Sequence, residues 1–385
     1  MALINLTGFE TGAADECTLS GTASIQSSTI ITGDYSLRTN PTTTATGYAE
    51  IKALAADGTA TDANVATSYI RFKFRYATKP ATDAEPLFAI YDSGSSQKCS
   101  VRLVDTGVLR FTPASGSSTA GATVLAANTT YRVEIKVSTG ASSAFEVKLD
   151  GTSELSGTGD LGTNNAAFVR LGKSVSLADK SVDFFFDDFV WKDDAYPGAG
   201  TIQRMAPNAQ GFYSDFSPNT GTETECVDDN PHDGDTTYIS DSFSFVDLSS
   251  TFELESASSA GISGTINGVK PYIIAHGGGS STHGVRMHID ISDYDSGQST
   301  ASDYRLVAKV HSTNPDTTVA WTTGDLDALQ VGIAVTSAAG GLNRCTAVGA
   351  MVDFTEAAPS WDASMMPMAF GNFHPVRKTP TIRAF

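Results

Sequence analysis

The sequence has few cysteines, and they do not form a metal-binding or disulfide pattern. The four cysteines lie far apart in a chain of 385 residues, with no Cys-x-x-Cys pair and no Cys/His spacing typical of zinc sites. Disulfides are rare in cytosolic proteins. We therefore expect four reduced, buried thiols in preference to a Cys17–Cys99 or a Cys226–Cys345 bridge.

Positive charge and long apolar runs are also scarce. The chain has 25 Lys and Arg against 43 Asp and Glu, which gives a net charge of −18. A surface of this charge repels phosphate backbones, so nucleic acid is excluded as a partner. No run approaches the roughly 18 apolar residues that span a bilayer, which argues against membrane insertion. The first ten residues lack a basic and an apolar region, so we expect no export through a signal peptide.

The motifs of common hydrolases are missing as well. The sequence has no Gly-x-Ser-x-Gly, no His-Glu-x-x-His and no Glu-x-Asp-x-x-Glu run. Glu253 and Glu255 share one face of an expected strand, but a pair in a strand rich in solvent-side charge is more often surface decoration. We therefore predict a non-enzymatic protein with no catalytic residue and no bound cofactor.

What the sequence does contain is short alternating runs, separated by clusters of Gly, Asn, Asp and Ser. In the run 68–76, for example, Ile70, Phe72 and Phe74 alternate with basic residues. This rhythm predicts an all-β chain made of antiparallel sandwiches, each strand with one buried face. The expected strands are 68–76, 131–137, 144–149, 167–171, 182–191, 251–255, 270–276, 284–291, 304–310, 329–335 and 346–354. The expected core residues of the first half are Phe72, Phe74, Val133, Ile135, Val147, Leu149, Phe184, Phe186 and Val190.

Charge, proline and glycine gather in residues 192–200, directly after a strongly apolar run. This composition is typical of a boundary or a hinge between two units. We predict four parts, which are a jelly-roll-like sandwich over 1–194, a linker with connecting strands over 195–240, a second β-sandwich over 241–354 and an extended C-terminal arm over 355–385.

The densest group of oxygen ligands lies in residues 228–235. Calcium favours carboxylates on a loop, but the spacing is not that of an EF-hand, and an acidic turn with Asx-type hydrogen bonds is the favoured interpretation. The weak calcium candidates are therefore Asp228, Asp229, Asp233 and Asp235. For the pair Asp187 and Asp188 we expect one buried and one exposed carboxylate, because neighbouring strand residues point to opposite faces.

Three elements of the first half resemble a known fold family. They are the opening Gly8-Phe9-Glu10, the strand pair 131–137 and 145–151 with its Asp-Gly turn, and the closing run Phe186-Asp-Asp-Phe-Val190. Together they resemble concanavalin A-like (laminin-G-like) jelly-roll domains. The resemblance covers about half of the chain and implies a jelly-roll sandwich there.

The segment 193–211 and the run 226–239 look like the linker that follows lectin-like domains in structural proteins of tailed-phage virions. The Trp that usually precedes the Val-Asp-Asp element is absent here, and Phe212 and Tyr213 stand nearby. The resemblance implies a virion structural protein, assembled in the host cytoplasm, that decorates the capsid or is attached to the tail. Its partners would be copies of itself and other virion proteins.

The end of the chain differs from the rest, because prolines, methionines, aromatics and basic residues gather in an otherwise acidic sequence. This composition is compatible with a disordered end or with an extended arm on a neighbouring subunit. On the second interpretation, the arm should dock on an acidic partner copy, and its deletion should abolish oligomers while leaving both sandwiches folded. The expected subunit-contact residues are Trp361, Met365, Met366, Phe370, Phe373, Arg377, Lys378, Arg383 and Phe385.

A carbohydrate-binding adhesin that recognises host surface glycans is the alternative function. Sugar sites need an exposed aromatic ring with amides and carboxylates beside it. Two candidates meet this requirement in the sequence, namely Tyr91 with Asp92, and Tyr294 with Asp293 and Asp295.

Overall fold

The computed structural model describes residues 3–42, 44–54, 60–175, 181–241, 247–278, 281–337 and 341–357. Strands make up 54% of the protein and helices 4%, so the all-β prediction is confirmed. Each expected strand is present, with ends that differ by a few residues. The helices are short: the 3-10 turns η1 (Ala14–Glu16) and η2 (Thr224–Cys226), and α1 (Thr323–Ala328).

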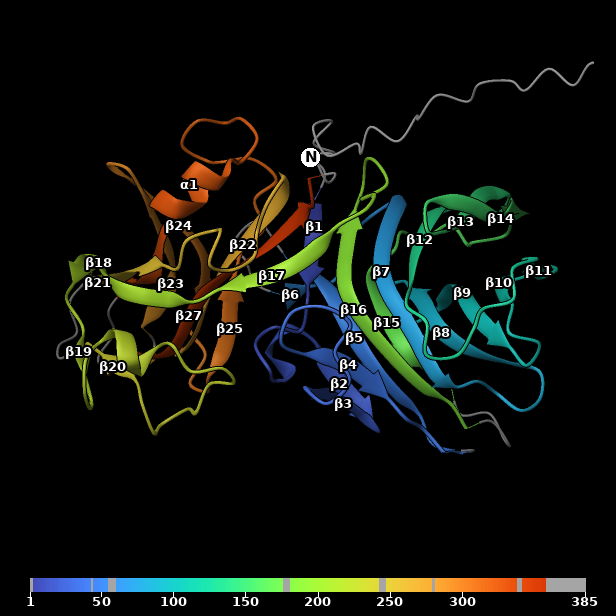
Figure 1. Cartoon of the computed structure of the whole chain (residues 1–385), viewed down its shortest axis with the longest axis horizontal. Coiled ribbons are helices and arrows are strands. Elements are labelled where there is room, and N and C mark those ends of the chain that lie inside the picture. Colours follow the sequence, from blue (N-terminus) through green and yellow to red (C-terminus); the bar gives the residue numbers. More distant parts are fainter. Residues whose placement is uncertain are drawn as a thin grey trace, which may run out of the picture.

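Two sheets of eight strands face each other in the first sandwich (Figure 1). All strand pairs named for these sheets are antiparallel. The first sheet runs β14 (Thr152–Gly159), β13 (Ser143–Leu149), β12 (Tyr131–Ser138), β7 (Thr67–Thr78), β16 (Asp183–Lys192), β4 (Ser36–Thr39), β3 (Ala23–Gln26), with β1 (Leu3–Thr7) on β16. The second runs β11 (Thr119–Ala120), β10 (Leu109–Pro113), β9 (Gln97–Val104), β8 (Ala84–Tyr91), β15 (Phe168–Lys173), β5 (Gly47–Leu54), β2 (Thr18–Gly21), with β6 (Ala60–Thr61) on β5.

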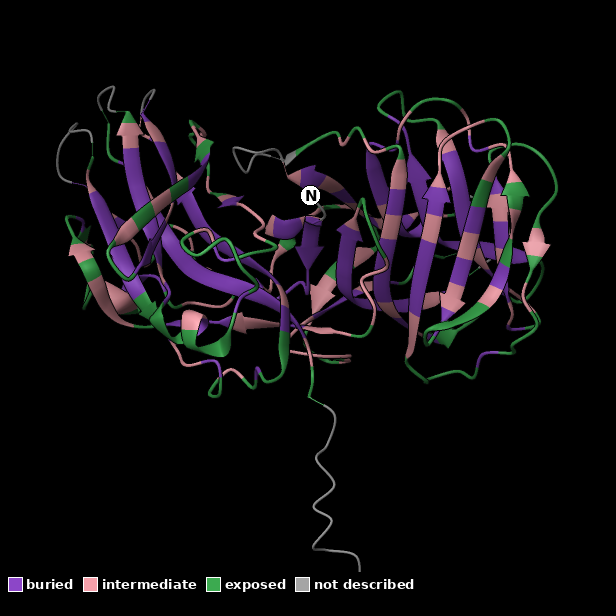
Figure 2. Cartoon of the chain, turned by 90° about the horizontal axis from the view of Figure 1, so that it is seen from above, coloured by how far each residue is buried: buried purple, intermediate pink, exposed green. Residues whose placement is uncertain are grey.

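The core of the first sandwich forms because apolar residues alternate along its strands and the register brings them together. Val133 lies opposite Phe72 on one side and Leu149 on the other. All nine predicted core residues are buried, as the interior in Figure 2 illustrates. Eight of them belong to this core, whereas Val190 packs in a separate cluster between the two sandwiches.

Leu149 tests the assignment of the strand faces. It is 8% exposed and lies in the core of the first sandwich. We expect Leu149→Ala to lower the free energy of unfolding by about 2–5 kcal/mol, because the truncation leaves a cavity. Urea unfolding measures this change. A loss below about 0.5 kcal/mol, typical of a surface position, would show that the faces are inverted.

The second sandwich packs a six-stranded sheet against a five-stranded one. Its buried cluster includes Phe252, Ile273 and Val348. The larger sheet runs β19 (Ser217–Pro218), β20 (Ile239–Ser240), β27 (Arg344–Thr355), β22 (Thr265–His276), β25 (Arg305–Ala308), with β17 (Thr201–Met205) on β27. The smaller runs β18 (Pro207–Ser214), β21 (Ser249–Leu254), β26 (Gln330–Ser337), β23 (Thr282–Ile289), β24 (Ser292–Ser299).

The range 195–240, expected as a linker with connecting strands, supplies β17, β18, β19 and β20 to the sheets of the second sandwich. The connection before β17 is held against the first sandwich by side chains. Tyr196 Oη donates to Glu146 Oε2 at 2.7 Å, and the Gly198 amide donates to Glu134 Oε1 at 2.8 Å. These contacts argue against a free hinge in residues 193–200.

The two sandwiches meet in a buried interface. Its apolar part is a cluster of residues from both sides, namely Leu3, Leu6, Val190, Ile202, Tyr272, Ile274, Ala308, Ala347 and Met351. Its polar part includes an ion pair from Arg71 Nη2 to Asp353 Oδ1 at 2.7 Å, with both side chains almost fully buried. Gly200 lies against this pair, and a Cβ there would overlap with Arg71 Nη1.

The expected C-terminal arm lies almost entirely outside the described residues, which end at residue 357. All nine expected subunit-contact residues, from Trp361 to Phe385, lie outside them as well. The virion function therefore stays a prediction. No helix in the described ranges is long and apolar enough to cross a membrane.

Candidate functional site

The first aromatic candidate from the sequence, Tyr91 with Asp92, is buried and cannot receive a sugar ring. Tyr91 is 4% exposed and stacks on Phe168 with ring centroids 5.2 Å apart. The guanidinium of Arg170 covers its ring at 4.5 Å. Asp92 is 2% exposed and accepts a hydrogen bond from Asn164 at 3.1 Å. The prediction is wrong at this position because residues of a neighbouring strand cover the ring.

The second candidate is divided between the two faces of its sheet. In β24, Tyr294 pairs with Met287, a core residue, and packs toward the interior of the second sandwich. Asp293 and Asp295 point to the other face, because successive strand residues alternate. The two carboxylates therefore belong to an outer surface that Tyr294 does not share.

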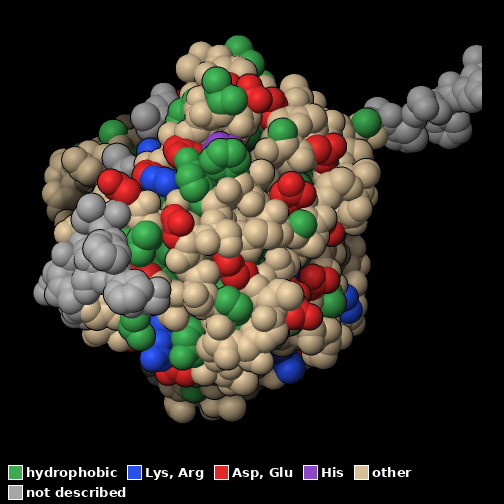
Figure 3. Space-filling model, turned by 90° about the vertical axis from the view of Figure 1, so that its left-hand side faces the viewer, with side chains coloured by type: hydrophobic (Ala, Val, Ile, Leu, Met, Phe, Trp, Pro, Cys, Tyr) green, Lys and Arg blue, Asp and Glu red, His purple; other side chains and the backbone are tan. Residues whose placement is uncertain are grey.

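Aromatic rings reach that outer surface from β18. The pairing of β18 with β21 is irregular between Gln210 and Ser214, so the segment between them leaves the regular ladder. This segment passes close to β21 at Gly211, where a Cβ would stand 2.7 Å from the Thr251 carbonyl oxygen. The next residue, Phe212, is 68% exposed. Figure 3 shows hydrophobic side chains gathered around a histidine on the second sandwich, at the left-hand end of the molecule in Figure 1.

Three rings from two distant parts of the chain, β18 and β23, meet at this surface. Phe212 stacks on His288 with centroids 4.7 Å apart and ring planes at 14°. Tyr213 stands edge-on to Phe212, at 4.9 Å and 83°. Tyr213 Oη donates to Asp293 Oδ2 at 2.5 Å, and His288 Nδ1 lies 2.7 Å from Asp293 Oδ1. One carboxylate therefore holds the Tyr213 and His288 rings, and Phe212 packs against both of them.

The hydrogen bonds of Asp293 also fix its charge. Its partial burial acts to raise the pKa, but the hydrogen bonds from Tyr213 and His288 outweigh burial and lower it. The same bond to Asp293 raises the pKa of Tyr213. At neutral pH Asp293 is thus an anion and Tyr213 a neutral phenol.

Charged and amide groups form the rim of the aromatic surface. Arg286 forms a bidentate ion pair with Asp295, with both distances 2.7 Å, and its guanidinium lies 5.2 Å from the Tyr213 ring centroid. Gln330 Oε1 accepts from the Phe212 amide at 2.7 Å. We call this surface the Phe212 platform, and its members are Phe212, Tyr213, Arg286, His288, Asp293, Asp295 and Gln330.

Of the seven residues of the Phe212 platform, only Asp293 and Asp295 were predicted from the sequence to lie at a sugar site. Phe212 and Tyr213 stand near the position of a missing Trp, and the sequence predicted no role for them. A signal was present, because an adjacent Phe-Tyr pair directly after Gly211 breaks the alternation of an otherwise regular strand. The contact of these rings with His288 depends on strand order and has no signal in the sequence.

The weak calcium candidates lie in a turn, and three of their carboxylates accept hydrogen bonds from other side chains of the protein. Thr237 Oγ1 donates to Asp229 and Asp233 at 2.7 and 3.0 Å, and Asp235 accepts from Arg344 at 2.6 Å. Asp228 has a raised pKa through burial and the charge of Asp229. Among the described residues, no group of three or more His, Cys, Asp and Glu side chains is arranged to hold a metal ion.

The expectation for Asp187 and Asp188 is wrong, since both carboxylates are fully buried. The pairing of β16 with β7 is irregular from Asp187 to Val190, and Asp188 has a φ of 50°, so the simple alternation fails there. Ser36 Oγ donates to Asp187 at 2.8 Å, and Lys73 Nζ lies 2.6 Å from Asp188 Oδ2.

A third buried carboxyl, Glu10, lies near this pair. Glu10 is 0% exposed, and within the described part of the chain its Oε1 has no hydrogen-bond partner. Burial first, and the charge of Asp187 second, raise the pKa of Glu10 to about 10. The cluster therefore holds a proton at neutral pH. We expect it to affect the pH dependence of stability and not the surface function.

The four cysteines are free. Cys99, Cys226 and Cys345 are buried as expected, whereas Cys17 is half-buried. Neither of the two considered bridges is formed.

Comparisons with known proteins add little to this geometry. No family model matches the sequence, and no curated protein is similar to it. Among solved structures, the cellulose-induced protein Cip1 has a TM-score of 0.39 at 12% identity, over 51% of this chain and 99% of that one.

Two further solved structures are similar to the same extent. They are an endo-β-1,4-glucuronan lyase from the fungus Trichoderma reesei (TM-score 0.36, 12% identity, 52% of this chain and 99% of that one) and domain 4 of AbnA, a GH43 extracellular arabinanase from Geobacillus stearothermophilus, in complex with arabinotriose (0.34, 16%, 50% and 92%). These scores are too low to support an argument about function, so the function proposed below rests on the described side chains.

Proposed function

We propose that this protein is a non-enzymatic carbohydrate-binding protein that holds a glycan on the Phe212 platform. The observation that carries the proposal is an exposed ring fixed in place beside charged and amide groups. Phe212 is 68% exposed, although its lower face is covered by His288. The apolar face of a sugar ring can stack on the open face of Phe212, while its hydroxyls reach the rim.

The rim offers the hydrogen-bonding groups that a sugar requires. Asp293 and Asp295 are acceptors for hydroxyl groups, and the guanidinium of Arg286 is a donor. These groups already hold one another in place through the contacts with Tyr213 and His288. Binding therefore orders few side chains, and the cost in conformational entropy is small.

The test is a binding measurement on an array of immobilised host-type glycans, with Phe212→Ala as the central variant. We expect this variant to bind at least about tenfold more weakly than wild type, because it loses the stacking surface at the centre of the site. Phe212→Trp should retain binding, since it keeps an aromatic face.

Val124→Ala is the matched control. Val124 is 67% exposed but lies on the first sandwich, and its truncation should leave binding unchanged. Equal binding by wild type and Phe212→Ala would place any glycan site elsewhere, and no binding by wild type to any sugar would contradict the proposed function.

A further inference from the structure

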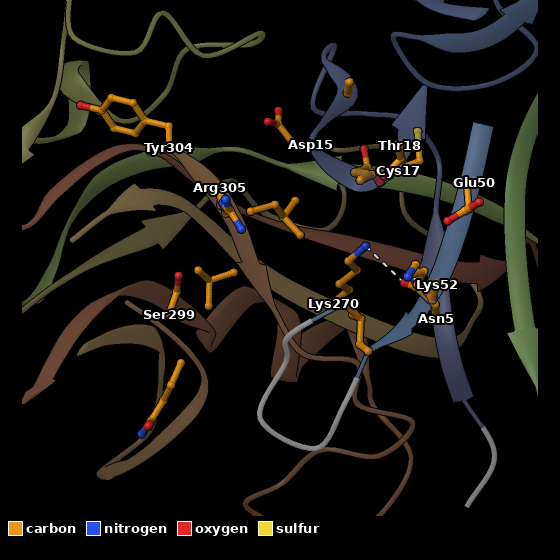
Figure 4. Close-up of a pocket in the computed structure, with 16 residues that line it drawn as sticks. Asn5, Asp15, Cys17, Thr18, Glu50, Lys52, Lys270, Ser299, Tyr304 and Arg305 are labelled. Carbon is orange, nitrogen blue, oxygen red and sulfur yellow. Dashed lines mark hydrogen bonds between the residues drawn. The ribbon is translucent and has the colours of Figure 1, made fainter. Parts of the chain in front are cut away.

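A cavity of about 420 Å³ lies between the two sandwiches (Figure 4). Its walls come from β1, η1, β2 and β5 on one side and from β22, β24 and β25 on the other. Two of its lining residues, Asn5 and Lys270, contact each other across the boundary between the sandwiches. This contact has no role in the proposed glycan site.

Lys270 and Asn5 are buried and close together. Lys270 is 1% exposed and Asn5 is 2% exposed. Lys270 Nζ donates to Asn5 Oδ1 at 3.3 Å, which is the dashed line in Figure 4, and to the Leu6 carbonyl oxygen at 2.9 Å. The amine is therefore held beside the side-chain carbonyl group of Asn5.

The orientation of the Asn5 amide is fixed by both of its ends. Its Nδ2 donates to the Lys52 carbonyl oxygen at 2.7 Å, while its Oδ1 accepts from Lys270. The side chain of Leu3 in β1 also packs tightly on β22, since a Cβ on Gly268 would stand 2.5 Å from Leu3 Cδ2. This approach of β1 to β22 keeps the two reacting groups at the short separation that a unimolecular reaction requires.

The surroundings favour the uncharged forms that the chemistry needs. Burial lowers the pKa of Lys270, against the opposing effect of the charge on Glu16. Burial likewise raises the pKa of Glu16, which lines the same cavity. An amine is a nucleophile only without its proton, and a protonated carboxyl can transfer a proton to a leaving group.

We propose that Lys270 and Asn5 form an intramolecular isopeptide bond that joins the two sandwiches covalently. The lysine Nζ attacks Cγ of Asn5, so the Nζ–Cγ bond forms and the Cγ–Nδ2 bond breaks. One proton moves from Nζ to Nδ2, and Nδ2 leaves as ammonia. The products are one secondary amide and one ammonia molecule, and no oxidant or other reactant is consumed.

We assign the transfer of this proton to Glu16, a buried carboxyl that lines the same cavity as Lys270 and Asn5. Its carboxyl is held by Thr7 and Thr11, with the Thr11 amide donating at 3.1 Å. The cavity gives the departing ammonia a route away from the buried carbonyl carbon. The reaction needs the folded protein, because residues 5 and 270 are close only after both sandwiches have docked.

Mass spectrometry of the wild-type chain tests the bond directly. We expect the purified protein to be lighter than its sequence by one ammonia molecule, about 17 Da, the leaving group of the acyl transfer. Trypsin does not cut after Lys270, because Pro271 follows it. The digest should therefore contain one joined species made of residues 1–38 and 205–286. A wild-type chain with its full sequence mass and with these two peptides separate would overturn the proposal.

Lys270→Met and Asn5→Leu provide the matched controls, because each removes one reacting group and keeps an apolar side chain of similar size. Both should have the full sequence mass, compared with wild type after the same N-terminal processing. Loss of ammonia from either variant would overturn the assignment of the bond to this pair.

Glu16→Gln tests the proton transfer separately from folding. We expect the freshly synthesised variant to lose ammonia on the order of 100-fold more slowly than freshly synthesised wild type, followed as the 17 Da mass change, as the loss of a general acid–base group predicts. Circular dichroism in the same experiment confirms that the variant folds. An unchanged rate in a folded Glu16→Gln chain would overturn the role of Glu16.

Discussion

Replacing Arg71 by methionine should lower the free energy of unfolding by about 3–5 kcal/mol, since it leaves a buried carboxylate without its partner. Asp353 is 2% exposed, and its ion pair with Arg71 spans the boundary between the sandwiches. Burial outweighs the effect of Arg71 and raises the pKa of Asp353 even in the intact pair. Without Arg71, that carboxylate must be protonated or the interface must open.

Urea unfolding of three variants separates this effect from a general loss of packing. The double variant Arg71→Met with Asp353→Leu should recover most of the loss, because neither charge then remains buried. Arg75→Met on the same strand is the control. Arg75 is half-buried and hydrogen-bonds the exposed Asn128, so we expect a change below about 1 kcal/mol. An Arg71→Met variant as stable as wild type would contradict the importance of the ion pair.

Glu10→Gln should remove a large part of the pH dependence of stability. The pKa of Glu10 is about 10 in the folded protein, against an ordinary value of 4.5. The folded state therefore keeps a proton that the unfolded chain loses above pH 4.5. The stability from this group is complete below that pH and is lost as pH rises toward 10, with a slope of about 1.4 kcal/mol per pH unit.

Denaturant unfolding between pH 5 and 9, in the presence of EDTA, measures this slope without interference from cations. We expect the slope for Glu10→Gln to be shallower by about 1.4 kcal/mol per pH unit, which corresponds to one proton. The variant should also be more stable than wild type at pH 8. The matched control is Glu253→Gln, at an exposed glutamate. Identical slopes for wild type and Glu10→Gln would show that Glu10 is ionised in the folded protein.

The strands could be predicted from the sequence because their signal is local. Ile70, Phe72 and Phe74 alternate with polar residues, and a strand places alternate residues on one face whatever surrounds it. The same rule failed at Asp188, where an irregular pairing changes the direction of the side chain. The sugar-site prediction at Tyr91 failed for another reason, since the covering of its ring by Phe168 and Arg170 depends on a neighbouring strand.

The sequence by itself determined the all-β class and most of the first core, because each depends on composition or on period-two alternation. Only the tertiary structure decided which residues meet across distance. Phe212 and His288 stack although 76 positions separate them, and Lys270 contacts Asn5 across 265. Such contacts follow from strand order and from the docking of two sandwiches, which local pattern does not encode.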